Sequence, residues 1–183
     1  MAGSLAGNPF LESGPARLIV NEVTGGGVSN LFGRIEVFGS AADVVVANPW
    51  GITCNGCGFI NTQRASLVTG RPMWAGAALD GFSVTGGALI VGSNGLAGPS
   101  LGSLDLIGGS IAVAGSVQLD GANSAIYAVA GPNQVNYSSL AATVNASVLM
   151  FDAEITTLPP LARIEPPSLR SPAESSVNAP VRA

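Results

Sequence analysis

Two cysteines, Cys54 and Cys57, are the residues of this chain best suited to covalent or metal chemistry. Their spacing fits a redox-active pair, half of a zinc site, a structural disulfide or two free thiols. A thioredoxin-type pair needs its first cysteine at a helix start within a βαβ pattern, which the neighbouring sequence lacks. A zinc site needs two further cysteines or histidines, and the chain has neither. We therefore predict no metal site, and a disulfide and free thiols both stay open.

No other group of residues has the composition of a catalytic site. The chain contains no histidine, which excludes Ser-His-Asp and Cys-His arrangements. The aspartates are scattered, and we interpret each as a turn or solvent-facing residue: Asp43, Asp80, Asp105 and Asp120. Trp50 and Trp74 could stack on sugars, although aromatic residues beside turns more often cover a core edge. We predict that the chain is not an enzyme and uses no cofactor.

The composition indicates one domain with few charges. The 183 residues include 25 glycines, 47% hydrophobic residues and only 10% charged residues, so Ser, Thr, Asn and backbone groups must form much of the surface. The net charge of −4 argues against a nucleic-acid partner, which would require a basic stripe. No apolar run approaches the roughly 20 residues that cross a bilayer.

The hydrophobic pattern predicts an all-β chain of short strands. Apolar residues alternate with small or polar ones, and nearly every run ends at Gly, Asn or Pro. The predicted strands are 17–23, 34–38, 44–47, 58–61, 66–68, 82–84, 88–91, 104–107, 110–113, 116–119 and 125–130. A stacked solenoid and a β-sandwich both fit this pattern, and composition alone does not separate them.

Two turn motifs and several later landmarks resemble one family. Asn48-Pro49-Trp50-Gly51-Ile52 is similar to the Asn-Pro-Asn-Gly-Ile motif of the two-partner secretion domain of filamentous haemagglutinin-type exoproteins, with Trp50 at the position of an Asn. Asn8-Pro9-Phe10-Leu11 resembles the earlier Asn-Pro-Asn-Leu motif of that family. Further matches lie at Arg64, Leu67, Thr69, Gly70, Pro72, 104–107 and 129–137. The resemblance covers residues 5–137 and implies a right-handed parallel β-helix.

The resemblance also implies a function. Such domains are the secretion signals of adhesins, haemagglutinins, haemolysins and contact-dependent toxins, and an outer-membrane β-barrel transporter with periplasmic polypeptide-binding domains recognises them. The full-length protein would then be secreted or held at the cell surface after crossing the periplasm. One alternative is an adhesin β-helix that binds host-cell glycans or receptors. A minor alternative is a polysaccharide-active β-helix enzyme, whose carboxylates would have to be brought together by stacking.

Recognition is expected at the turn motifs. The predicted contact residues are Asn8, Pro9, Leu11, Asn48, Pro49, Gly51 and Ile52. Asn48 is the stronger candidate because it precedes a proline and its side chain can accept a hydrogen bond from the turn backbone. For Gly51 and Ile52, a role in shaping the coil is at least as well supported. Export to an oxidising compartment favours a disulfide between Cys54 and Cys57 over free thiols.

The organisation along the chain has three expected parts. Residues 1–137 would form a partial secretion β-helix, residues 138–158 a last coil or a short helix, and residues 159–183 a disordered tail rich in Pro and Ser. The opening residues have no basic or apolar signal-peptide region. Because the resemblance implies coils before the first motif, we expect the β-helix to be incomplete at its N-terminal end.

Overall fold

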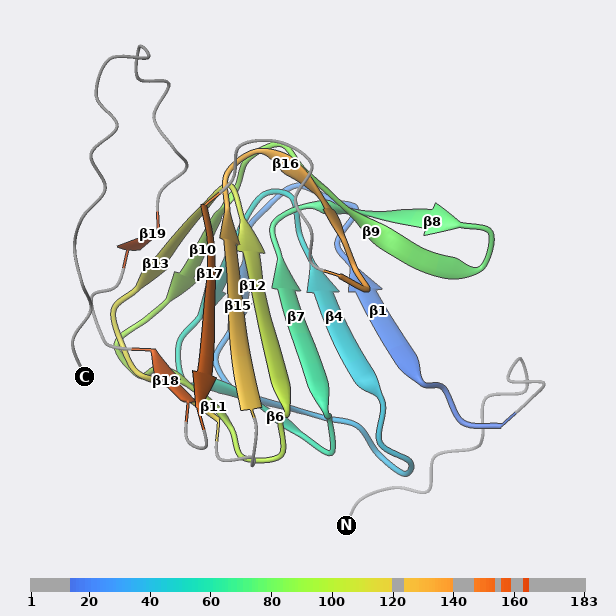
Figure 1. The fold of residues 1–183 in the computed structure, drawn as a ribbon, viewed down its shortest axis with the longest axis horizontal. Coiled ribbons are helices and arrows are strands. Elements are labelled where there is room, and N and C mark those ends of the chain that lie inside the picture. Colours follow the sequence, from blue (N-terminus) through green and yellow to red (C-terminus); the bar gives the residue numbers. More distant parts are fainter. Residues whose placement is uncertain (1–13, 120–123, 140–146, 154–155, 159–162, 165–183) are drawn as a thin grey trace.

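Alternating strands that end at tight turns stack into the coils of a parallel β-helix (Figure 1). The computed structural model describes residues 14–119, 124–139, 147–153, 156–158 and 163–164. Within these residues the chain is all β and has no helix, which confirms the predicted fold class. None of the described segments is a helix with the length and hydrophobicity of a membrane crossing.

Three sheets wrap around a common core, and each coil adds one strand to each of them. Sheet A consists of β1 (Leu18–Glu22), β4 (Asp43–Ala47), β7 (Arg64–Val68), β12 (Ser103–Gly108), β15 (Ser124–Ala130) and β17 (Ser147–Ala153). Sheet B consists of β2 (Ser29–Leu31), β5 (Ile52–Cys54), β10 (Ala88–Val91), β13 (Ser110–Val113) and β19 (Arg163–Ile164). Sheet C consists of β3 (Arg34–Glu36), β6 (Cys57–Ile60), β11 (Leu96–Gly98), β14 (Val117–Leu119) and β18 (Thr156–Leu158).

The parallel register explains the period-two pattern of the sequence. In sheet A, Val44, Ala65 and Leu104 lie side by side on successive coils, and Leu104 pairs in turn with Ile126. All four side chains are buried in the main core, because alternate residues of every strand point inward. A β-sandwich is excluded, since the strands of the coils, β1 to β7 and β10 to β15, pair in parallel with strands one coil away rather than with a hairpin neighbour.

A hairpin interrupts the third coil and covers part of sheet A. Sheet D consists of β8 (Arg71–Ala75), β9 (Ala78–Val84) and β16 (Asn133–Asn136), all paired antiparallel. Figure 1 shows this hairpin projecting from the end of the coils. Several strands lie outside those that the sequence predicts, namely β2, β5, β8, β11, β16, β17, β18 and β19. Apart from β17, they are short or contain Gly, Pro or Asn, so their periodicity is weak.

Beyond β15 the chain reverses direction. Strand β17 pairs antiparallel with β15, β18 with β14, and β19 with β13. The edge of each of the three coil sheets is therefore covered by a reversed strand. Within residues 138–158 the structure describes a turn at 138–139 and the strands β17 and β18, and no helix in those segments. The proposed division of the chain into three parts stays a prediction.

Candidate functional site

The turn after β4 carries the family motif, and Asn48 holds it together. The Asn48 side chain is fully buried. Its Nδ2 donates hydrogen bonds to the carbonyl oxygen of Gly27 (2.9 Å) and to Oγ of Ser29 (2.8 Å), both on the preceding coil. Its Oδ1 accepts a hydrogen bond from the backbone N–H of Trp50 (2.9 Å). One neutral side chain thus closes its own turn and joins two coils.

Gly51 and Ile52 return the chain to the core. Gly51 has φ of 129°, a region that side chains rarely adopt, and a Cβ there would lie 3.1 Å from the carbonyl oxygen of Ala88. Ile52 is fully buried and begins β5. Pro49 is half-buried between Asn48 and the exposed tip of the turn. The first motif, with Asn8, Pro9 and Leu11, lies outside the described residues.

Trp50 forms the exposed part of this turn. Its side chain is 39% exposed. The guanidinium of Arg71, on β8, lies 5.5 Å from the centroid of the Trp50 ring. A partner of the folded domain could therefore touch Trp50 and Arg71, whereas it could not reach the Asn48 side chain. The recognition role of the whole motif stays a prediction.

Cys54 and Cys57 lie at the corner between sheets B and C. The structure joins them in a disulfide with a Cα–Cα distance of 5.3 Å. Cys54 ends β5, Cys57 begins β6, and both side chains are buried in the main core. Reactive cysteines are partly exposed in electropositive surroundings. The burial of this pair therefore favours a structural role over a redox one.

A buried ion pair lies on the outer face of sheet A. Arg64 Nε donates to Asp105 Oδ2 at 2.8 Å, and Ser66 Oγ donates to the same oxygen at 2.6 Å. Ser103 Oγ donates to the other carboxylate oxygen at 3.4 Å. The Asp105 side chain is fully buried. Burial raises the pKa of Asp105, although the Arg64 charge and the Ser66 hydroxyl partly lower it.

Arg64 extends this cluster to Tyr137. A terminal guanidinium nitrogen of Arg64 donates to the Tyr137 carbonyl oxygen at 2.8 Å, and its Cζ lies 4.1 Å from the centroid of the Tyr137 ring. That ring packs edge-on against Phe82 of β9, with centroids 5.9 Å apart. Burial raises the pKa of Tyr137 to about 12, and the Arg64 charge opposes the shift. We call Arg64, Ser66, Asp105 and Tyr137 the Arg64 cluster.

The solvent-facing interpretation of Asp105 is wrong. The residue is inside an apolar strand, Leu104-Asp105-Leu106-Ile107, and its cation comes from a strand 41 residues earlier. An acid within such an apolar run is the sequence signal that was available for its burial. Asp43 is half-buried at the start of β4, Asp80 is exposed on β9, and Asp120 lies outside the described residues.

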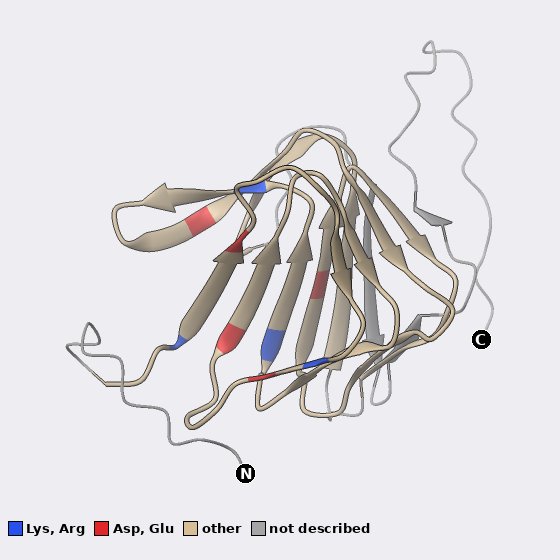
Figure 2. Ribbon diagram, turned by 180° about the vertical axis from the view of Figure 1, so that it is seen from behind, with Lys and Arg blue, Asp and Glu red and all other residues tan. Residues whose placement is uncertain are grey.

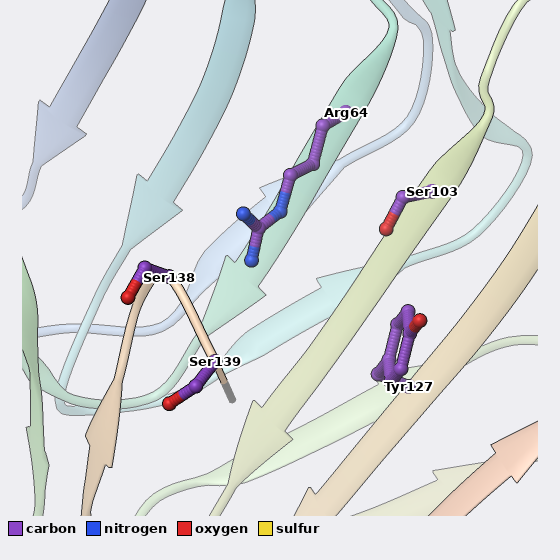
Figure 3. Close-up of a pocket in the computed structure, with 5 residues that line it drawn as sticks. All are labelled: Arg64, Ser103, Tyr127, Ser138 and Ser139. Atoms are coloured by element: carbon purple, nitrogen blue, oxygen red, sulfur yellow. The ribbon is translucent and has the colours of Figure 1, made fainter. Parts of the chain in front are cut away.

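A shallow pocket of about 260 Å³ adjoins the Arg64 cluster (Figure 3). Its lining residues come from β7, β12, β15 and the turn after β16: Arg64, Ser103, Tyr127, Ser138 and Ser139. The Ser138 and Ser139 hydroxyls both lie within hydrogen-bond distance of Asn136 Oδ1. The carboxylate of Asp105, which accepts from the lining Ser103 hydroxyl, is also bound by Arg64 and Ser66. The described residues contain no cluster of three metal-binding side chains.

Few charged side chains lie on the described strands. Figure 2 shows few blue and red positions among the described strands, and no basic stripe runs across that face. Nucleic-acid-binding proteins concentrate Lys and Arg on one face. The absence of a nucleic-acid partner stays a prediction.

Comparison with known proteins identifies the family. A profile of the TPS secretion domain matches residues 6–164. A hemolysin of Serratia marcescens is 43% identical over 143 residues, which is 74% of this chain and 9% of the relative. A protein named tRNA nuclease CdiA, of Escherichia coli (strain STEC_O31), is 50% identical over 109 residues, or 58% of this chain and 3% of the relative.

A solved structure agrees with these relatives. The crystal structure of a filamentous hemagglutinin secretion domain superposes with a TM-score of 0.64 and 32% identity, over 69% of this chain and 43% of that one. The chain spans less than a tenth of the length of the hemolysin and CdiA relatives. The nuclease activity in the CdiA name is therefore a property of a much longer protein. The matched profile and fold show that this chain belongs to the family of two-partner secretion (TPS) domains.

Proposed function

We propose that this chain is the secretion-signal module of a large bacterial exoprotein, recognised by an outer-membrane β-barrel transporter with periplasmic polypeptide-binding domains. The observation that carries this proposal is the family match over residues 6–164. The exoprotein would be an adhesin, haemagglutinin, haemolysin or contact-dependent toxin, and it would cross the periplasm to the cell surface or medium. The module itself performs no catalysis.

The buried position of Asn48 constrains how recognition would work. In the folded domain the side-chain amide of Asn48 is hydrogen-bonded to the Gly27 carbonyl, the Ser29 hydroxyl and the Trp50 backbone N–H. A transporter that reads Asn48 directly must therefore bind the chain before this coil closes. An extended, low-charge segment can add a strand to the edge of a partner sheet, with its side chains providing specificity. Coil formation outside the cell would then withdraw Asn48 from the partner.

Two substitutions in the motif test the proposal. Each is introduced into the full-length exoprotein, with its export signal and its transporter, and the protein released into the medium is measured. We expect Asn48→Ala to reduce secretion and Trp50→Asn to preserve or improve it, because Trp50 is partly exposed and stands where the family has Asn. Normal secretion of Asn48→Ala at unchanged thermal stability would contradict a role for this turn.

A matched control separates recognition from coil stability. Ser29→Ala removes a hydroxyl that accepts from Asn48 on the preceding coil but leaves the motif intact. If recognition dominates, Ser29→Ala destabilises the domain while secretion stays near wild type. If secretion falls in proportion to stability in both variants, the motif acts only by shaping the coil.

Exposed aromatic side chains favour one alternative, an adhesin surface. Trp74 is 50% exposed on the projecting hairpin, and Trp50 is 39% exposed. Flat, exposed rings can stack on sugar faces. Replacing both by Ala should abolish adherence to host cells while secretion continues, if this alternative holds. Loss of secretion with the remaining surface protein still adherent would favour the transporter role.

A further inference from the structure

Strands β9 and β16 form a layer over the outer face of sheet A, which we call the cover layer. It buries a second apolar cluster, separate from the core inside the coils. The cluster members are Val45, Ala47, Val68, Phe82, Val84, Ile107, Val129 and Val135. Sheet A contributes the outward-facing members, and the cover layer contributes Phe82, Val84 and Val135. The coils therefore keep their own core whether or not the layer is in place.

The cover layer is held together by its own backbone pairing. Its strands pair with each other and with β8, and none of them pairs with a strand of sheet A. The backbone N–H of Tyr137 continues this pairing by donating to the carbonyl oxygen of Asp80 at 2.8 Å. Contact with sheet A thus depends on side chains, namely the apolar cluster and the Arg64 cluster.

The Arg64 cluster lies at the C-terminal end of β16, where the cover layer ends. Arg64 and Asp105 belong to neighbouring strands of sheet A, whereas Tyr137 directly follows β16 and lies 73 residues after Arg64. One guanidinium binds the Asp105 carboxylate, the Tyr137 carbonyl and the Tyr137 ring at once. The ring in turn contacts Phe82, so the same residue fixes both strands of the layer.

We infer that the Arg64 cluster is a latch, and that the cover layer opens from sheet A as a unit while the coils beneath stay folded. Regions with separate cores and few connecting hydrogen bonds are those that open sub-globally. Opening would uncover the outward apolar face of sheet A and the antiparallel strands of the layer. This property goes beyond recognition by a transporter and does not depend on it.

Amide hydrogen exchange of the whole chain at low denaturant concentrations tests the latch. In the wild type we expect amides of β9, β16 and Tyr137 to exchange together, at lower denaturant than those of β5, β10 and β13. Tyr137→Ala removes the ring contacts and should speed exchange of the cover layer by roughly 10-fold or more. Exchange in sheet B should remain slower than in the cover layer and should keep its steeper dependence on denaturant, because it requires the coils themselves to unfold.

Tyr137→Phe is the matched control. It keeps the ring and the carbonyl and removes only a hydroxyl that is buried without a hydrogen-bond partner among the described residues. Its exchange should stay within about twofold of wild type. Arg64→Met, with native circular dichroism, should reproduce the effect of Tyr137→Ala in the cover layer. The inference would be overturned if cover-layer and sheet B amides of the wild type exchanged with the same opening free energy and the same denaturant dependence, or if the Ala variant did not accelerate exchange in the cover layer.

Discussion

The Asn48 turn and the Arg64 cluster each bury a polar side chain, Asn48 in one and Asp105 in the other, but the first uses neutral partners and the second an ion pair. Asn48 is neutral and bonds to residues 19 and 21 positions earlier, on the adjacent coil. The Arg64 cluster is charged and joins residues 39 to 73 positions apart. Asn61 makes the same kind of contact two corners later, between β6 and β7, with Nδ2 donating to the carbonyl oxygens of Val37 (2.7 Å) and Gly39 (2.8 Å).

In a solenoid the two kinds of polar contact have different requirements. A neutral side chain that binds the previous coil can be satisfied as soon as two coils exist, so it can recur along the stack. A buried ion pair carries a large desolvation cost and is stable only when all its partners are present. The Arg64 cluster therefore depends on the chain from β7 to Tyr137, and the Asn48 turn depends on one neighbouring coil.

The largest expected effect comes from breaking the charged cluster. Arg64→Met leaves the buried Asp105 carboxylate without its cation, and we expect the free energy of unfolding to fall by about 3 kcal/mol or more. Urea denaturation at pH 7 measures this. The loss should shrink as the pH falls towards 4, because the raised pKa of Asp105 lets the folded protein take up the proton that removes the buried charge.

A double variant shows whether the stability lost in Arg64→Met comes from the missing contacts of Arg64 or from the unpaired Asp105 carboxylate. Arg64→Met combined with Asp105→Leu removes both charges and should recover a large part of the stability lost in the single variant. Recovery would show that the penalty comes from the unpaired carboxylate. A double variant that is no more stable than Arg64→Met would show that the contacts of Arg64 with Tyr137 dominate.

An intermediate effect is expected at the neutral turn. Asn48→Asp keeps the oxygen that accepts from Trp50 but loses the amide that donates to Gly27 and Ser29. We expect a loss of about 1–3 kcal/mol in urea denaturation at pH 7, because the buried Gly27 carbonyl loses its donor and a carboxylate is buried. A loss equal to that of Arg64→Met would remove the distinction between the two sites.

The smallest effect at neutral pH is expected for Tyr137→Phe, and it should grow in alkali. The pKa of Tyr137 is raised from 10.0 to about 12 in the folded protein, so its stabilising contribution is complete below pH 10 and is lost as the pH rises towards 12. The wild type should therefore lose thermal stability relative to the variant as the pH rises from 10 towards 12. A melting-temperature difference that is constant with pH would contradict this.

The sequence predicts those parts of the fold that its local pattern encodes. Strands β4, β12 and β15 stand out because their apolar runs are long and end at clear turn residues. Strand β8 is missed because Pro72 weakens its strand pattern. The stacking order itself comes from the resemblance to the family, since periodicity does not distinguish a solenoid from a sandwich.

The candidate site is predictable to a similar extent. The turn at Asn48 can be recognised in the sequence, because the turn-forming residues Asn, Pro and Gly lie within five consecutive positions. The ion pair of Asp105 cannot be recognised in the same way, because Arg64 is brought next to it only by the register of β7 and β12. Pairing across an inserted hairpin has no local signature. Apolar neighbours can indicate that an acid is buried, but they do not identify the cation.

The reversed strands at the far end of the stack have a consequence for growth of the solenoid. Strands β17, β18 and β19 use the same row of backbone groups on β15, β14 and β13 that another parallel coil would need. Each N–H and C=O on that row can serve only one neighbouring strand. A further parallel coil and the reversed strands therefore cannot both pair with this edge. To extend the β-helix beyond β15, the reversed strands must first leave the edge and be replaced by the strands of the new coil.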